Sequence, residues 1–527
     1  MTKKKMVMVG IAGSTTDFLL SIHALKCFVY QKEEIKNNID ITLKQYYYIP
    51  LDEVDEKSQY IFNDIEKEEP DIVGFSCYVW NIDAVRTISD KLKQKNKDIQ
   101  IILGGPEIAR EDIIAGKFSD FSADFLFFGE GERPLLKFLE RILGISDHNL
   151  DEIKGFAHRN GNSFSCHSQL DFVEKLEELP SPYLTGFVSD ELLSRENMRV
   201  NIETQRGCNF RCAYCFYHKG FPSIRYRNPK IVVDEIEYAY NKGIKMGRIL
   251  DANFLSDREF AKGIIRELIN RKIKMALFFE MIPIFLDDET ANLFGEFSRL
   301  SENNMLMTGI GIQTLTQESL AVIRRQIHKK WFEKAFNLLQ AQGVIIKSDI
   351  ILGLPRETKE SYLKTLEFIT EKMRHGTNYL SLALLRVLPG TDLVDIAKKE
   401  KLVIDNRDSL HFVYSTPEMP RSDMVYCLRL NTVAFRLLSS VNIEERMKLR
   451  DLYFTVKDKL GATNIDMLEY FVKEFLEYLK PKKTNFVDPD FPNAEYYSFK
   501  TVYQDVSDGW LIEKLEGLKN TGLYTKT

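Results

Sequence analysis

The sequence has few cysteines, no long apolar run and little excess charge. Its seven cysteines in 527 residues include only one tight group, which is not the disulfide framework of a small secreted protein. No stretch approaches the roughly 18 apolar residues that cross a bilayer. The basic start, Met1–Lys5, precedes an apolar run too short for a secretion signal. These absences predict a protein of the reducing cytoplasm with no membrane segment.

The charge balance also limits the class of partner. The net charge is −5, with 44% hydrophobic and 28% charged residues, which excludes disorder and argues against a nucleic-acid-binding surface. At a prior of about 150 residues per domain, the length suggests about three folded units.

Residues 1–145 alternate between short apolar runs and amphipathic stretches. This pattern predicts a doubly wound, parallel α/β (Rossmann-like) domain, which binds ligands at the carboxyl ends of its strands. The predicted strands are Val7–Ile11, Ile41–Ile49, Ile72–Ser76, Ile99–Leu103 and Phe125–Phe128.

Three further segments follow. Residues 146–195 break the alternation and contain a turn signal at Asn160–Asn162, so we interpret them as a connector with a hairpin. Residues 196–402 predict a partial (β/α)6 barrel with its chemistry at the carboxyl-terminal mouth. Residues 403–527 predict a mainly helical substrate or lid region. The predicted barrel strands are Val200–Gln205, Arg248–Ala252, Met275–Glu280, Met307–Gln313, Val344–Leu352 and Tyr379–Val387.

The strongest chemical signal is the C-x3-C-x2-C array of Cys208, Cys212 and Cys215, directly after the first barrel strand. Three thiolates on a [4Fe–4S] cluster leave one iron open for the amino and carboxylate groups of S-adenosylmethionine (SAM). An electron delivered there would release a 5′-deoxyadenosyl radical. The alternative is a zinc site with His218 as the fourth ligand.

This array, with Tyr214 before its last cysteine, resembles the defining motif of the radical SAM superfamily. The resemblance continues through Phe278–Glu280, Gly309–Gln313, Asp349–Pro355 and Leu388–Thr391. It implies that SAM is bound by Tyr214, Glu280, Gln313, Arg325 and Asp349. Carboxylates suit an ammonium and ribose hydroxyls, an amide suits the ribose, and a guanidinium suits the carboxylate. Arg324 is an alternative to Arg325, and a cap or surface ion pair is the alternative role for each side chain.

The amino-terminal domain resembles the cobalamin-binding domains fused to one radical SAM subfamily. Glycines at the strand ends would let the backbone approach the corrin, and Tyr78 and Trp80 would pack on its face or belong to the core. The Asp-x-His-x-x-Gly element that ligates cobalt in some cobalamin proteins is absent, so we expect cobalamin without a histidine ligand. The predicted cobalamin-binding residues are Ser14, Thr15, Ser76, Cys77, Tyr78, Trp80, Asn81, Gly104, Gly105, Glu107, Gly129, Glu130, Gly131 and Glu132.

Together these resemblances imply a cobalamin-dependent radical SAM methyltransferase that acts, under anaerobic conditions, on an unactivated carbon of a small molecule or peptide. A flavodoxin or ferredoxin would supply electrons. Cyclisation or ring rearrangement is the main alternative. Methylthiotransfer would need three cysteines in the first domain, which has only Cys27 and Cys77. A non-catalytic cobalamin or redox sensor would leave the SAM motifs unexplained.

Overall fold

The structure is a computed structural model that describes residues 3–14, 16–47, 53–195, 197–221, 223–301, 306–376, 378–405, 409–439, 443–479 and 506–521. The chain divides into two compact units. The first comprises residues 1–211, 215–277 and 388–391, and the second comprises residues 212–214, 278–387 and 392–527.

A seven-stranded sheet of order β2-β1-β3-β4-β5-β6-β7 forms the amino-terminal part of the first unit. The first five strands run parallel, which confirms the predicted doubly wound domain. The order of these five is 2-1-3-4-5, which opens a ligand crevice at the carboxyl ends where the order reverses. The strands are β1 Lys4–Ala12, β2 Ile39–Tyr47, β3 Ile72–Ser76, β4 Gln100–Gly104 and β5 Phe125–Phe127.

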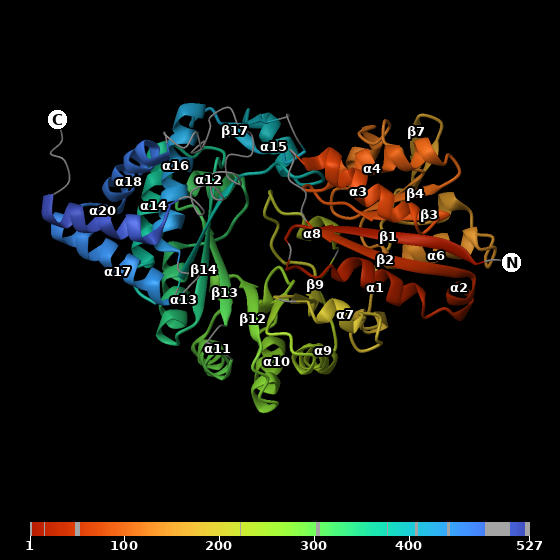
Figure 1. Ribbon diagram of the computed structural model, residues 1–527, viewed down its shortest axis with the longest axis horizontal. Coiled ribbons are helices and arrows are strands. Elements are labelled where there is room, and N and C mark those ends of the chain that lie inside the picture. Colours follow the sequence, from red (N-terminus) through yellow and green to blue (C-terminus); the bar gives the residue numbers. More distant parts are fainter. Residues whose placement is uncertain are drawn as a thin grey trace. The chain divides into compact units, whose positions relative to one another are not determined.

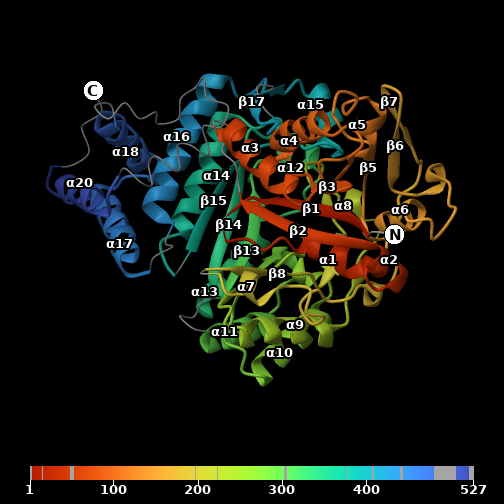
Figure 2. The same ribbon diagram turned by 45° about the vertical axis from the view of Figure 1, so that its right-hand side comes forward.

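Helices cover both faces of this sheet (Figures 1 and 2). Successive side chains of a strand point to opposite faces. Val7 and Val9 therefore pack with α3 and α4, whereas Met6 and Met8 pack with α1 and α6. The helices of this part are α1 Leu20–Val29, α2 Glu33–Asn38, α3 Val54–Glu66, α4 Ile82–Lys95, α5 Arg110–Ile114 and α6 Glu132–Ile142.

The segment interpreted as a connector adds two strands to the same sheet. The antiparallel hairpin of β6 (Phe156–Asn160) and β7 (Ser163–Cys166) pairs with the edge of β5. Gly161 turns the hairpin at φ +59°. The rest of the connector holds η2 Leu150–Glu152, η3 Leu176–Glu178 and α7 Asp190–Leu193.

The second sheet has six strands in the order β15-β14-β13-β12-β11-β8, at the six predicted barrel positions. Strand β8 runs parallel to β11, and β12, β13, β14 and β15 run parallel in turn. Alternate residues of β14 and β15 are only half-buried, so one face of these strands is open for ligands. The strands are β8 Arg199–Ile202, β11 Met246–Ile249, β12 Ala276–Met281, β13 Met307–Gln313, β14 Ile345–Leu352 and β15 Asn378–Leu384.

Short strands, turns and helices connect these strands. Helix α9 begins after the Asn228 cap with Pro229, and α14 begins with a capping box at Thr358. The connecting elements are β9 Gln205–Arg206, α8 Tyr217–Gly220, β10 Arg225–Tyr226, α9 Pro229–Asn241, η4 Phe254–Ser256, α10 Arg258–Asn270, η5 Pro283–Phe285, α11 Asp288–Leu300, α12 Gln317–Val322, α13 Lys329–Ala341, α14 Lys359–Lys372 and α15 Leu393–Lys399.

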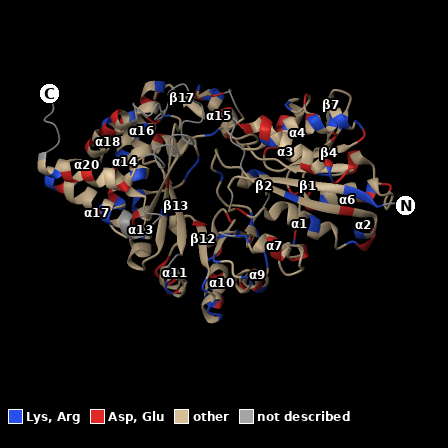
Figure 3. Cartoon of the chain, viewed as in Figure 1, with Lys and Arg blue, Asp and Glu red and all other residues tan. Residues whose placement is uncertain are grey.

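The carboxyl-terminal region is mainly helical, as predicted. Helix α16 packs on β15, α14 and α18, and α17 packs on α20. Basic and acidic residues are interspersed along α17 and α20 (Figure 3). In the described part of the chain, no helix has both the length and the apolar character to span a membrane. The elements are β16 Val403–Ile404, β17 Val413–Ser415, α16 Arg421–Leu438, α17 Ile443–Leu460, α18 Asn464–Leu479 and α20 Asp508–Thr521.

Candidate active site

The three cysteines of the array lie in the cluster loop, Gly207–Phe216, which follows β9. Gly207 has φ +100°, and a Cβ atom there would overlap the carbonyl oxygen of Ser223, so the turn requires glycine. Cys208 and Cys215 are partly exposed, Cys212 is buried, and none of them forms a disulfide. The Phe210 N–H donates to Cys208 Sγ over 3.4 Å, a contact of the kind that tunes cluster sulfurs.

The donor set of the loop suits a cubane. Among the residues that the structure describes, no three His, Cys, Asp or Glu side chains are arranged to hold one metal ion. A [4Fe–4S] cluster does not need that arrangement, because each thiolate bonds a different iron atom. Three thiols from one loop, one of them already accepting a backbone hydrogen bond, therefore fit the cluster.

A buried carboxyl supports the strand end from which the cluster loop departs. Asp251 accepts hydrogen bonds from the backbone N–H groups of Thr204 and Gln205, over 3.0 and 3.2 Å, and from the Thr204 hydroxyl. Burial raises the pKa of Asp251 to about 7. Asp251 was not predicted as a functional residue, because it follows β11 without any motif to mark it.

The predicted SAM-binding residues of the second unit converge on two glycines of β13. A Cβ atom on Gly309 would overlap Glu280 Oε2, and one on Gly311 would overlap Gln313 Nε2. The missing side chains leave room for Glu280 and Gln313 to lie over the strand. Asp349 is paired with Gly311 in the register of β13 and β14. The two glycines therefore allow the Glu280 and Gln313 side chains to lie against β13.

The Gln313 side chain has a hydrogen-bond acceptor that a ligand could use. It ends β13 with φ +63°, and its Oε1 atom is buried without a hydrogen-bond partner among the described residues. Buried acceptors are normally satisfied. A ribose hydroxyl of SAM would supply the missing donor, so this residue fits the predicted role.

Arg325, rather than Arg324, faces the cluster loop. Its Nη1 donates to Cys212 Sγ over 3.7 Å, and its Nη2 donates to the Gly311 carbonyl oxygen over 2.9 Å. Arg324 instead pairs with Asp392 over 2.6 Å, with half of its side chain exposed. Tyr214 is half-buried within the cluster loop.

An unpredicted lysine lies between the carboxylates of Glu280 and Asp349, the two acidic residues predicted to bind SAM. Lys347 Nζ is 2.8 Å from Asp349 Oδ1 and 3.4 Å from Glu280 Oε1. Positions 347 and 349 of β14 point to the same face because strand side chains alternate. That alternation was the signal in the sequence that would have identified Lys347. Its ammonium lies where carboxylates would receive a cationic group of SAM.

A chamber of about 440 Å³, named the cobalamin chamber after its predicted ligand, opens at the carboxyl ends of β1, β3, β4 and β5, within the first unit. Its wall also includes Asn201, Glu203 and Arg206, which precede the cluster loop. No histidine is among the described residues that line it. The predicted cobalamin-binding residues in its wall are Ser76, Tyr78, Trp80, Gly104, Gly105, Gly129, Glu130, Gly131 and Glu132.

The loop that carries Tyr78 and Trp80, called the aromatic loop, is held in place by internal contacts. The Tyr78 and Trp80 rings stack at 4.4 Å between centroids and 11° between planes. The Trp80 indole N–H donates to the Ile11 carbonyl oxygen over 3.1 Å. Both rings line the chamber. Gly105 has φ +113° and lies so close to the backbone of Cys77 that a Cβ atom would not fit. Flat aromatic surface and bare glycine backbone fit a corrin.

Four of the other predicted cobalamin-binding residues do not line the chamber. Asn81 accepts from the Tyr78 N–H over 2.7 Å and donates to the Ser76 carbonyl oxygen, so it holds the aromatic loop. Cys77 is fully buried, and burial raises the pKa of Glu107, which pairs with Lys117, to about 7. Ser14 Oγ contacts Thr16 Oγ1 over 3.1 Å. The remaining prediction, Thr15, lies outside the described residues.

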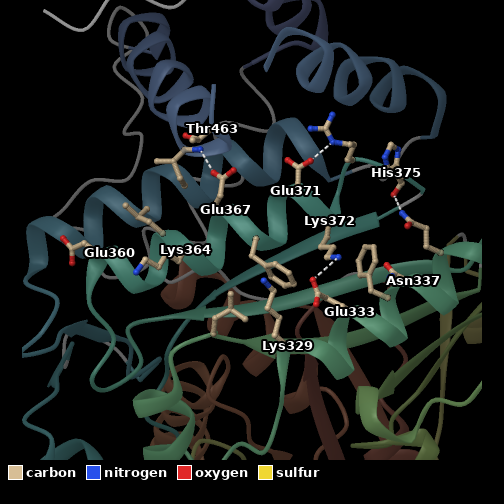
Figure 4. Close-up of a pocket in the computed structure, with 17 residues that line it drawn as sticks. Lys329, Glu333, Asn337, Glu360, Lys364, Glu367, Glu371, Lys372, His375 and Thr463 are labelled. Carbon is tan, nitrogen blue, oxygen red and sulfur yellow. Dashed lines mark hydrogen bonds and ion pairs between the residues drawn. The ribbon is translucent and has the colours of Figure 1, made fainter. Parts of the chain in front are cut away.

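A larger hollow of about 970 Å³ lies on α13 and α14 of the second unit, beside the start of α18 (Figure 4). Several of its charged side chains are used in internal contacts. Lys372 pairs with Glu333 over 3.5 Å, and Glu367 accepts from the Asn464 side-chain amide over 2.8 Å. None of the predicted site residues lines it.

Two segments of the chain match known protein families. Residues 202–369 match the radical SAM superfamily, and residues 43–139 match the B12 binding domain. The match to the radical SAM superfamily implies a [4Fe–4S] cluster and SAM, and the match to the B12 binding domain implies cobalamin.

Individual relatives are distant. The chain is 24% identical over 384 residues to the cobalamin-dependent radical SAM methyltransferase TokK of Streptomyces tokunonensis, covering 68% of this chain and 55% of TokK. It is 24% identical to the anaerobic magnesium-protoporphyrin IX monomethyl ester cyclase of Rubrivivax gelatinosus, over 56% of this chain and 53% of the cyclase. The chain spans about half the length of these curated relatives.

The fold is also that of a solved structure. The cobalamin-dependent SAM radical enzyme OxsB, with aqua-cobalamin bound, superposes with a TM-score of 0.67 at 15% identity, over 100% of this chain and 82% of OxsB. At this identity the likeness concerns the fold alone.

Proposed function

The chain carries a B12-binding domain joined to a radical SAM domain, and on this premise we propose that it is a methyltransferase that methylates an unactivated carbon. The observation that carries the proposal is a proximity within the first unit. Arg206 lines the cobalamin chamber, and Cys208 follows it by two residues. Cobalamin in the chamber and a cluster on Cys208 would therefore face one reaction space, as a methyl donor and a radical source must.

The residues that would hold the cofactors lie in the cluster loop and in the wall of the cobalamin chamber. Cys208, Cys212 and Cys215 would hold the cluster, and the walls around Tyr78 and Trp80 would hold cobalamin. When bound, the cluster supplies the electron that cleaves SAM to a radical, and cobalamin carries the methyl group to the substrate.

The side chains of the second unit would orient SAM. Arg325 would pair with the SAM carboxylate, because its guanidinium already lies beside Cys212. Gln313 Oε1 would accept from a ribose hydroxyl. Glu280 and Asp349 would receive the amino group and ribose, with Lys347 balancing their charge until SAM arrives. Fixing SAM at both ends aims its reactive carbon and lowers the entropic cost of reaction.

The substrate class and the electron source complete the proposal. We propose a small molecule or peptide as the methyl acceptor, a flavodoxin or ferredoxin as the reductant, and a reducing cytoplasm as the location. Cyclisation or ring rearrangement is the second candidate, because a cyclase is among the relatives.

Metal content of the anaerobically purified and reconstituted protein tests the cofactor set. About four irons and one cobalt per chain are expected from the ligand count. About eight irons without cobalt would instead indicate a methylthiotransferase. Four irons without cobalt, after incubation with cobalamin, would refute cobalamin dependence.

A further inference from the structure

A buried network of charged side chains forms part of the chamber wall in the first unit. Its centre is Arg206. The guanidinium donates from Nη1 to Glu130 Oε2 over 3.0 Å, from Nη2 to Glu132 Oε1 over 2.7 Å, and from Nε to Glu203 Oε1 over 2.9 Å. Arg206, Glu130 and Glu132 are 8%, 6% and 5% exposed. All three nitrogens of the fork are therefore held by carboxylates away from water.

A second arginine closes the network. Arg225 Nη2 donates to Glu130 Oε1, and the Val173 N–H donates to Glu130 Oε2 over 3.0 Å. Both oxygens of Glu130 are thus used by protein groups. Burial alone would raise the pKa of Glu132, but Arg206 holds it below its usual range. Arg206 therefore balances the charge of Glu132, and both oxygens of Glu130 are already used by protein groups.

The network joins two pieces of chain that carry different cofactor sites. Glu130 lies in the turn between β5 and α6, Glu132 begins α6, and both line the cobalamin chamber. Arg206 ends β9 two residues before Cys208, and it is paired with Arg225 in the register of β9 and β10. The tight turn at Gly207 leaves little freedom between Arg206 and Cys208. The contacts that hold the Arg206 guanidinium therefore also hold the beginning of the cluster loop in place.

We propose that Arg206 is a positioning residue that locks the first cluster cysteine to the wall of the cobalamin chamber, and that Glu130 and Glu132 serve this lock rather than bind the corrin. The inference rests on the cofactor placement of the proposed function, but not on methyl transfer. A guanidinium suits the role because its planar fork binds carboxylates with fixed geometry, whereas a lysine ammonium does not.

The substitution Arg206→Lys keeps the charge and removes the fork. A matched control is Arg227→Lys. Arg227 pairs with Glu235 through two contacts of 2.8 and 2.9 Å, is 6% exposed, and does not line the chamber. Both substitutions disturb buried arginine–carboxylate contacts of the same unit, so both should lower the melting temperature. Only Arg206→Lys should change the relation between the two cofactors.

The readout is electron paramagnetic resonance of protein loaded with both cofactors and poised so that cob(II)alamin and the reduced cluster coexist. Wild type and Arg227→Lys are expected to show one well-defined dipolar interaction between the two centres. Arg206→Lys should show a shifted or broadened interaction at unchanged iron and cobalt content. A wild-type interaction in Arg206→Lys, or equal broadening in Arg227→Lys, would overturn the proposal.

A second variant covers the case in which Arg206→Lys fails to hold both cofactors. Glu132→Gln replaces one of the three carboxylate acceptors of the Arg206 guanidinium by a neutral amide, and it should broaden the interaction while leaving the cobalamin dissociation constant unchanged. Weakened cobalamin binding with an unaltered interaction would assign Glu132 to the corrin and refute the lock. The measurement needs no methyl acceptor, so it stands apart from the test of methyl transfer.

Discussion

The guanidinium of Arg325 is hydrogen-bonded to the sulfur of Cys212, with 3.7 Å between Nη1 and Sγ. Its other terminal nitrogen donates to the Gly311 carbonyl oxygen over 2.9 Å. One side chain thus contacts both a cysteine of the cluster loop and the backbone of β13 at Gly311, two residues before Gln313. In the proposed placement of SAM, Arg325 would hold its carboxylate beside the cluster loop and Gln313 would hold its ribose at the end of β13.

Replacing Arg325 by alanine should therefore weaken SAM binding. Hydrogen bonds to charged groups are worth about 1.5–3 kcal/mol, which corresponds to roughly a tenfold or larger rise in the SAM dissociation constant. Isothermal titration of the cluster-loaded protein measures it, and iron content should not change. Arg324→Ala is the matched control, because Arg324 pairs with the outer Asp392. A defect confined to Arg324→Ala would move the SAM contact by one residue.

Replacing Cys208, Cys212 and Cys215 together by alanine should abolish the iron–sulfur absorbance and SAM cleavage. Cobalamin binding should survive, because no residue of the array is among those lining the cobalamin chamber. Absorbance spectra of the variant with and without added cobalamin measure both properties. The assignment of the array fails if a full cluster assembles in the triple variant.

Cobalamin should bind base-off, with no protein nitrogen on cobalt. The described chamber wall contains no histidine. His23 is buried elsewhere, its Nδ1 lies 2.9 Å from the Leu19 carbonyl oxygen, and burial lowers its pKa to about 4. Weak axial ligation favours the reduced cobalt that accepts a methyl group. Superhyperfine splitting from an axial nitrogen in the cob(II)alamin resonance would contradict this expectation.

Protein stability should fall as the pH rises toward 8, in part because of Glu357. Burial raises the pKa of Glu357 to about 8, against hydrogen bonds from Thr314 and Thr316 that lower it. The folded protein therefore retains a proton that the unfolded chain loses near pH 4.5. The resulting stabilisation is complete below that pH and is lost as the pH passes about 8.

Glu357→Gln should flatten this dependence, because the amide stays neutral. Each pKa unit corresponds to about 1.4 kcal/mol, so melting temperatures of the two proteins between pH 5 and 9 should diverge measurably. Glu360→Gln, at an exposed position of α14, is the control. Parallel curves for wild type and Glu357→Gln would show that Glu357 is ionised in the folded protein.

Local patterns predicted the strands well because their cause is local. β3 and β13 begin and end at the predicted residues, since buried apolar runs and terminal glycines or polar residues mark them. The turn signal at Gly161 likewise predicted the hairpin. Its pairing with β5 was not predicted, because an edge partner depends on the assembled sheet rather than on the hairpin sequence.

The charged groups show where sequence reasoning stops. Glu130 and Glu132 were assigned to cobalamin from their glycine-rich loop, yet both pair with Arg206, more than 70 positions away. A single sequence gives no sign of such a distant partner. The position of Lys347 could have been predicted, by contrast, because its spacing from Asp349 in a strand places both side chains on the same face.

Methyl transfer through cobalamin is tested most directly with SAM that carries a trideuterated methyl group. The reconstituted protein would be reduced with cobalamin bound, and its products analysed by mass spectrometry. We expect a deuterated methyl group on the bound cobalamin, an equal amount of S-adenosylhomocysteine, and 5′-deoxyadenosine from a second SAM. Formation of 5′-deoxyadenosine with neither labelled cobalamin nor S-adenosylhomocysteine would contradict methyl transfer and favour cyclisation or rearrangement.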